Sequence, residues 1–386
     1  FKRFPAADLN KDGTLTREEV RAFNQKRRPN QPDANPRTLA PTHPDVSYGD
    51  HRLQAFDLWL AKPDHDQPTP LCIYIHGGGF RGGDKRGVSP ALIKRYLDAG
   101  ISFASLNYRL TNGGEFPYPI PMHDSARALQ FIRSKAGEWN LDPTRVACYG
   151  GSAGAGISLW LAFHDDLADP DSDDPIARQS TRITAAGTTN GQSTYDMRTI
   201  REWYGLPDLP TEAALIPFYN MKEGDTPDTP RVAKLAEDAS PINHLSKDDT
   251  TPVHMSYNAP DVPVTKNTNP GVWIHHAKFG LKLQEAMQKQ NLECIVTHPG
   301  LKNDTYQDLP DFLIKKLKAP AATPTPPTSS SPSPAPASHP HPASATTHPL
   351  TPPRALPSTA KSSAPSPRPS APKNAARPSP PPAGSA

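Results

Sequence analysis

The chain of 386 residues contains no run of 18 or more apolar residues and only three cysteines. Without such a run, no segment is predicted to span a membrane. The three cysteines, Cys72, Cys148 and Cys294, each lie inside an apolar stretch, and their number is odd. We therefore expect reduced thiols in a hydrophobic core and not a disulfide framework.

The last 68 residues lack aromatic and acidic residues and hold 21 of the 49 prolines. This composition buries too little apolar surface to offset the entropy lost on ordering, so residues 319–386 are predicted to form a disordered Pro/Ser/Ala-rich tail. The tail carries five of the 42 basic residues, which leaves 37 basic and 39 acidic residues upstream. The body is therefore near neutral, and the pI of about 8.6 is no argument for a nucleic-acid partner.

Three further regions precede the tail. Residues 1–28 are charged and helix-prone, and residues 29–45 carry five prolines typical of an extended linker. From 46 to 318, apolar runs alternate with amphipathic segments. Strands are expected within 53–61, 71–79, 101–110, 145–151, 183–189, 252–258 and 292–298, and helices within 90–99, 123–139, 153–163 and 278–290.

This alternation predicts an α/β layer architecture with a mainly parallel sheet, because strands covered by helices on both faces are almost continuously apolar. Residues 192–245 fit the alternation poorly. We interpret them as an insertion that forms a lid or a substrate wall.

The segment Gly150-Gly151-Ser152-Ala153-Gly154 matches G-x-S-x-G between an expected strand and an expected helix. A turn this tight needs small flanking residues, and its strain exposes the serine hydroxyl above the sheet. The same pattern also suits a glycine-rich turn with a buried hydroxyl. The motif therefore predicts a nucleophile only together with further evidence.

That evidence is His76-Gly77-Gly78-Gly79-Phe80, which follows an expected strand 76 residues before Ser152. Its glycines allow the N–H groups of Gly78 and Gly79 to converge with that of Ala153 on a developing oxyanion. Neither G-K-[ST] nor G-x-G-x-x-G occurs, which argues against a phosphate-binding turn. We expect His76 to brace this loop by hydrogen bonds and not to transfer protons.

At these motifs the chain resembles the α/β-hydrolase superfamily, in particular esterases with an HGGG oxyanion loop, such as bacterial feruloyl and acetyl carbohydrate esterases. The resemblance covers residues 46–318 and rests on YGDHRLQAFDLWLA, IYIHGGGFRGGDKR, SLNYRL, HDSARALQFIRS, LDPTRVACYGGSAGA and APDVP. It implies an α/β-hydrolase fold, a Ser–Asp–His triad in that chain order and no cofactor for catalysis.

The resemblance places the acid after the seventh strand of the family's fold, which corresponds here to the expected strand within 252–258, so Asp261 is the candidate; Asp196 and Glu202 are poorer candidates. The base is where the chain departs from the family, because Asn303 stands near the usual histidine position and an amide cannot accept a proton at neutral pH. His298, at the end of the last expected strand, is the first choice. The adjacent His275 and His276 are the alternatives, and a site without a competent base also remains open.

Residues 8–19 fit the calcium-loop pattern D-x-[DN]-x-[DN]-G-x5-E of an EF-hand. Gly13 permits the sharp turn, and Leu15 fills the apolar position. Oxygen ligands for Ca²⁺ are expected from Asp8, Asn10, Asp12, Thr14, Thr16 and Glu19. A weak structural remnant of such a loop is the alternative, because these loops usually occur in pairs. The acidic stretch 164–175 is expected to be a solvated loop, with cation binding as the alternative.

Together these features predict a serine carboxylester hydrolase with a calcium-binding appendage. The resemblance implies acetyl or feruloyl esters of polysaccharides as substrates. Extracellular glycans and millimolar calcium favour a secreted or periplasmic location. Two other hypotheses stay open, a hydrolase-fold protein that binds without catalysis and a serine peptidase of the prolyl-oligopeptidase kind.

Overall fold

The computed structural model describes residues 39–62 and 67–319, and an eight-stranded sheet forms its centre. The strand order is β1-β2-β4-β3-β5-β6-β7-β8. β1 and β2 pair antiparallel with their neighbours, and β3 to β8 run parallel. The strands are β1 (His43–Ser47), β2 (Ala55–Trp59), β3 (Thr69–Ile75), β4 (Ser102–Leu106), β5 (Leu141–Gly151), β6 (Ala185–Thr189), β7 (Val253–Ser256) and β8 (Cys294–Thr297).

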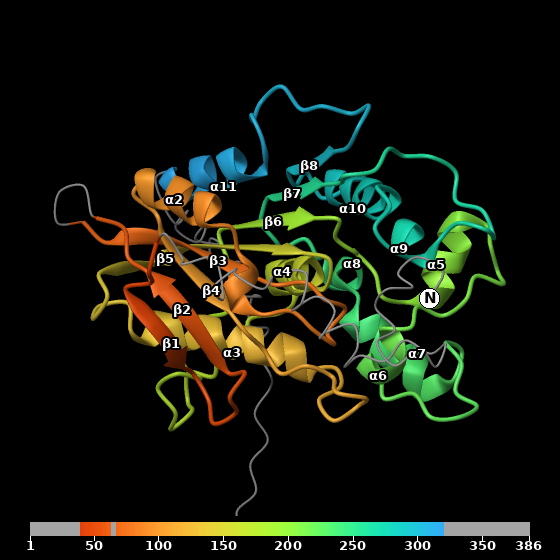
Figure 1. The fold of residues 1–386 in the computed structure, drawn as a ribbon, viewed down its shortest axis with the longest axis horizontal. Coiled ribbons are helices and arrows are strands. Elements are labelled where there is room, and N and C mark those ends of the chain that lie inside the picture. The colour runs from red at the N-terminus through yellow and green to blue at the C-terminus, as the bar shows by residue number, and fades with distance from the viewer. Residues whose placement is uncertain (1–38, 63–66, 320–386) are drawn as a thin grey trace, which may run out of the picture. The chain divides into compact units, whose positions relative to one another are not determined.

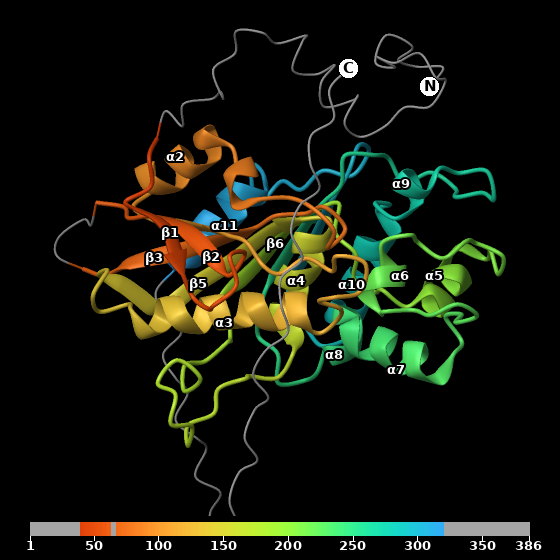
Figure 2. The ribbon, with the colours of Figure 1, turned by 60° about the horizontal axis from the view of Figure 1, so that its bottom comes forward.

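Helices cover both faces of this sheet (Figure 1). On one face, α2 (Pro90–Asp98) and α11 (Leu309–Lys318) pack through Tyr96 and Phe312. On the other face lie α3 (Ile120–Ser134) and α4 (Ala153–Phe163), as the turned view in Figure 2 shows. Every residue of α4 is buried, which explains why its sequence is apolar on all sides. The α/β prediction is therefore confirmed, and the topology is that of the α/β-hydrolase fold.

Residues 29–45, predicted to form a linker, include the beginning of the first strand. The structure has β1 from His43, where it pairs with β2. Pro44 cannot donate a ladder hydrogen bond, but an edge strand tolerates proline because one side of it needs no partner. Proline content therefore concealed an edge strand.

The region 192–245 forms short helices beside the sheet and not a further sheet element. They are α5 (Met197–Tyr204), α6 (Leu215–Phe218), α7 (Pro230–Ala239) and α8 (Pro241–His244). Two more helices follow β7, namely α9 (Pro270–Trp273) and α10 (Lys278–Gln288), and a short 3-10 turn, η2 (Lys85–Gly87), precedes α2.

The three cysteines are buried and free, as the sequence predicted. Among the described residues, no helix combines the length and apolar character that crossing a bilayer requires.

Candidate active site

Ser152 occupies the turn between β5 and α4, with φ of 51° and ψ of −118°. Non-glycine residues rarely adopt positive φ, and such strain persists only where the surroundings fix it. A Cβ atom added at Gly150 would lie 2.3 Å from the backbone of Gly154, and one at Gly154 would lie 2.1 Å from the Ile75 oxygen. The glycines of G-x-S-x-G are thus required sterically, and Ser152 is held half-exposed at the end of the strand.

The HGGG loop faces this serine. Gly78 and Gly79 have φ of 111° and 59°, and both line a pocket together with Ser152 and Ala153. Within residues 39–62 and 67–319, no hydrogen bond occupies the backbone N–H of Gly78, Gly79 or Ala153. Three free donors beside a serine hydroxyl form the arrangement that stabilises an oxyanion in acyl transfer.

His76 lies below this loop and is 4 % exposed. Its ring stacks on Tyr108 with centroids 4.5 Å apart, and its Nδ1 donates to the Gly77 carbonyl at 2.8 Å. Burial lowers the pKa of His76. The side chain therefore braces the oxyanion loop, in agreement with the role expected from the sequence.

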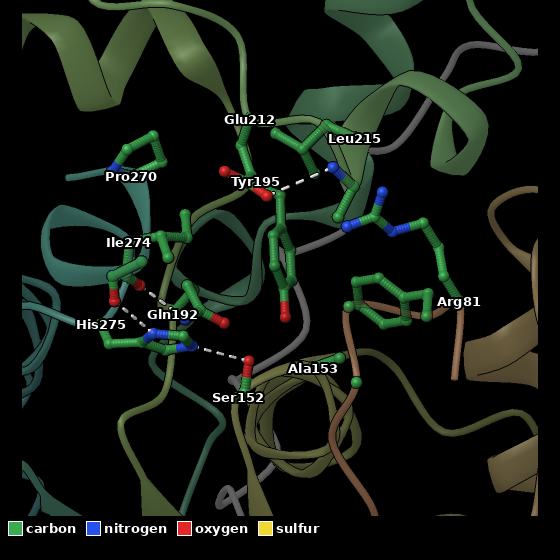
Figure 3. Close-up of a pocket in the computed structure, with 15 residues that line it drawn as sticks. Arg81, Ser152, Ala153, Gln192, Tyr195, Glu212, Leu215, Pro270, Ile274 and His275 are labelled. Carbon is green, nitrogen blue, oxygen red and sulfur yellow. Dashed lines mark hydrogen bonds between the residues drawn. The ribbon is translucent and has the colours of Figure 1, made fainter. Parts of the chain in front are cut away.

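The histidine beside the serine is His275 (Figure 3). Its Nε2 lies 2.9 Å from Ser152 Oγ, and its Nδ1 lies 2.8 Å from the Gly271 carbonyl oxygen. A carbonyl oxygen can only accept, so Nδ1 carries the proton and Nε2 keeps a lone pair for the serine proton. Ser152 and His275 thus form a hydroxyl–imidazole pair in which the ring is oriented by a backbone carbonyl.

The structure does not bring together Ser152, Asp261 and His298, the triad that the sequence favoured. His298 Nδ1 bonds to the Pro299 carbonyl, and its backbone pairs with Leu301. The alternative, His276, donates from Nε2 to the Val262 carbonyl at 2.7 Å, and Asp261 Oδ1 lies 3.5 Å from that same nitrogen. Asp261 therefore accompanies His276, one residue away from the histidine that contacts Ser152.

The reason for this difference is local geometry. The chain after β7 forms α9, and its turn carries the side chain of His275 toward Ser152 while His276 is buried on the other side. Sequence order alone did not distinguish two adjacent histidines. It also could not identify Gly271 as the orienting acceptor, because any residue can offer a carbonyl.

The remaining candidates have structural contacts. Asn303 Oδ1 accepts from the backbone N–H groups of Thr305 and Tyr306, and Asp196 caps α5 by accepting from Arg198 at 2.9 Å. Glu202 is exposed on α5. None of these three side chains lines the pocket that holds Ser152.

This pocket has a volume of about 460 Å³. The region 192–245 supplies one wall, which is where the sequence predicted a lid or a substrate wall. The lining residues are Gly78, Gly79, Phe80, Arg81, Ser152, Ala153, Gln192, Tyr195, Glu212, Ala214, Leu215, Pro270, Gly271, Ile274 and His275.

Three polar side chains that line this pocket were not identified from the sequence. Gln192 Nε2 donates to the Ile274 carbonyl at 2.6 Å and so ties the loop after β6 to the base. Arg81 and Glu212 also line the pocket, and Glu212 Oε1 accepts from the backbone N–H of Ala214 at 3.3 Å. Charged residues in loops are common, and only the fold shows that these two face one cavity.

The acidic stretch 164–175 forms turns in which carboxylates accept from nearby groups. Asp166, for example, accepts from Ser180, Thr181 and Ala168. The expected calcium ligands Asp8, Asn10, Asp12, Thr14, Thr16 and Glu19 lie outside the described residues.

The strand order, the strained serine turn and the facing HGGG loop define an α/β-hydrolase fold with a serine hydroxyl beside an imidazole. A profile of the BD-FAE family matches residues 56–268, more than half of the chain. The chain belongs to the BD-FAE family.

Two curated relatives come from Mycobacterium tuberculosis. A probable carboxylic ester hydrolase, LipM, is 30 % identical over 209 residues, which is 53 % of this chain and 44 % of LipM. Carboxylesterase NlhH is 37 % identical over 93 residues, or 24 % of this chain and 28 % of NlhH. The match thus spans less than half the length of each relative.

A solved structure described as a truncated form of a carbohydrate esterase from gut microbiota superposes with a TM-score of 0.54. The alignment covers 71 % of this chain and 95 % of that one at 18 % identity. At this identity the likeness supports the fold alone.

Proposed function

We propose that the protein is a serine carboxylester hydrolase that works through an acyl-enzyme. The observation that carries the proposal is the 2.9 Å contact between Ser152 Oγ and His275 Nε2. His275 takes the serine proton as Oγ attacks the ester carbonyl, and the N–H groups of Gly78, Gly79 and Ala153 stabilise the oxyanion. The protonated imidazole then returns the proton to the leaving alcohol, and water repeats the sequence to release the acid.

The Gly271 carbonyl replaces the usual carboxylate in this scheme. It fixes the tautomer and the orientation of His275, which are two functions of the carboxylate in a catalytic triad. It offers a dipole and not a full charge to the imidazolium. We therefore infer slower turnover than a carboxylate-supported triad gives, with an unchanged order of steps.

For the substrate, we propose acetyl or feruloyl esters of polysaccharides. The pocket of about 460 Å³ exceeds the size of an acetyl group and leaves room for an aromatic acyl group or part of a sugar. Arg81 and Glu212 offer donors and acceptors to sugar hydroxyl groups, and the structural neighbour is named a carbohydrate esterase.

Labelling with a fluorophosphonate, together with p-nitrophenyl acetate hydrolysis, tests the proposal. We expect wild type and His298→Ala to label and to hydrolyse the ester, and Ser152→Ala to do neither. Wild type that is folded but neither labels nor hydrolyses would favour a binding protein. Cleavage of dipeptide amides at rates similar to the ester would favour a peptidase.

We also propose calcium binding by residues 8–19. Six residues of this loop offer oxygen ligands at the spacing of an EF-hand. Calorimetry with Ca²⁺ should detect one site that Glu19→Gln weakens at least tenfold, because the bidentate closing ligand is lost. Equal affinity in wild type and variant would refute this assignment without bearing on the esterase.

A further inference from the structure

Away from the serine pocket, two histidines and an aspartate meet where three helices end. His164 follows the last residue of α4, Asp238 is near the end of α7, and His244 ends α8. One ligand atom of each residue lies within 4.8 Å of those of the other two. Figure 2 shows α8 beside α7, below α4.

The ring nitrogens of both histidines are already assigned by hydrogen bonds. His164 Nδ1 donates to the Asp165 carbonyl at 2.9 Å, and His244 Nε2 donates to the Asp238 carbonyl at 2.6 Å. Each ring therefore keeps a lone pair on its other nitrogen. Metal-binding histidines typically donate their second N–H to a carbonyl or carboxylate in this way.

The carboxylate of Asp238 keeps one oxygen available. Tyr118 donates its hydroxyl to Asp238 Oδ2 at 2.7 Å, which leaves Oδ1 for another partner. Ser240, between α7 and α8, is fully buried and accepts from the Tyr195 backbone at 2.9 Å, so the junction that carries Asp238 and His244 is fixed.

A further histidine, His123, lies near Trp160, the residue that His164 contacts. The rings of His164 and Trp160 are tilted by 30° with centroids 3.9 Å apart, and the centroid of the His123 ring lies 6.0 Å from that of Trp160. His123 is exposed at the surface.

We propose that His164, Asp238 and His244 form a binding site for a divalent transition-metal ion of the Zn²⁺ type. Two imidazoles and a carboxylate are ligands that zinc prefers, and water completes four-coordination. Zinc holds tetrahedral ligands about 3.3 Å apart, so the exposed Asp238 side chain moves inward on binding. The ion would also lie at the C-terminal end of α4, where the helix dipole favours positive charge.

The proposal separates this site from the residues of the acidic stretch that follow His164. In that stretch Asp166 accepts hydrogen bonds from Ser180 and Thr181, whereas the remaining nitrogen lone pairs of His164 and His244 have no hydrogen-bond partner among the residues the structure describes. It is also independent of the esterase proposal, because none of the three ligands lines the serine pocket.

Zn²⁺ titration of the untagged full chain by calorimetry tests the site, with saturating Ca²⁺ present to occupy the N-terminal loop. We expect one site whose affinity falls 10- to 100-fold in His244→Gln and in Asp238→Asn, whereas His298→Ala binds as wild type does. Thermal unfolding without metal establishes that each variant is folded. A second readout is quenching of tryptophan fluorescence by Cu²⁺, which Trp160→Phe should reduce.

Equal Zn²⁺ affinity in wild type, His244→Gln and Asp238→Asn would overturn the proposal, as would no binding by wild type. Loss of binding in His298→Ala to the same extent as in His244→Gln would also overturn it, because the site would then lie elsewhere.

Discussion

The turn after β5 and the loop after β7 both bring reacting groups to the carboxyl end of the sheet, but different constraints shape them. The first is defined by steric exclusion: a Cβ at Gly154 would lie 2.1 Å from the Ile75 oxygen. The second is defined by a hydrogen bond from a side chain to the Gly271 carbonyl. Steric exclusion restricts which amino acids can occur, whereas a backbone acceptor does not. The serine turn is therefore recognisable in a sequence, whereas the carbonyl that orients His275 is not.

Replacing the base gives the largest expected effect. His275→Ala should lower kcat/KM for p-nitrophenyl acetate by about 10⁴- to 10⁶-fold, since loss of a base in such a unit costs nearly as much as loss of the nucleophile. His298→Ala is the matched control and should retain wild-type kinetics. A large loss in His298→Ala with near wild-type kinetics in His275→Ala would instead identify His298 as the base, as the sequence favoured.

Enlarging a glycine of the serine turn tests whether steric exclusion shapes that turn. Gly154→Val should destabilise the fold by about 3 kcal/mol or more, because its Cβ meets backbone that cannot rotate away. Denaturant unfolding measures the change. Gly271→Ala should unfold close to wild type, because its Cβ meets only the Asn269 side chain at 3.2 Å. Comparable losses in both variants would contradict the steric contrast.

A histidine in β7, the strand before the second loop, is expected to make the stability of the fold depend on pH. Burial lowers the pKa of His254 in β7 to about 4. Between that value and the ordinary value near 6.5, the unfolded chain binds the proton and the folded chain does not, so stability falls as the pH falls through this window.

The full effect at His254 amounts to about 3 kcal/mol at most. Chemical denaturation at pH 7 and pH 4.5 should therefore show a smaller loss in His254→Gln than in wild type. Part of the loss should remain, because burial also lowers the pKa of His76. An identical loss in wild type and variant would show that His254 does not titrate in this way.

The smallest effect is expected at the carboxylate that the sequence assigned to the triad. Asp261→Asn should change kcat/KM by less than about tenfold, because Asp261 lies against His276 and not His275. Loss of a triad carboxylate costs about 10⁴-fold, so a drop of that size would show that Asp261 serves the base.

The sequence predicted the sheet, the serine turn and the oxyanion loop because each imposes a residue pattern. Apolar runs located seven of the eight strands, and only β1, with Pro44 at the sheet edge, was missed. The sequence offered three histidines as the base and could not settle which one acts, since the adjacent His275 and His276 differ only in the direction their side chains take. No sequence motif marks the other polar residues of the pocket, and only the fold brings them together: Gln192, Arg81 and Glu212.

The separation of Gly271 and His275 by four residues has a consequence for how such a site arises. When an imidazole and its acceptor belong to one short segment, a single insertion or exchange of that segment can introduce both. A carboxylate and a histidine on separate loops must instead be gained together. Hydrolases of this topology could thus exchange one kind of proton relay for the other by local change alone.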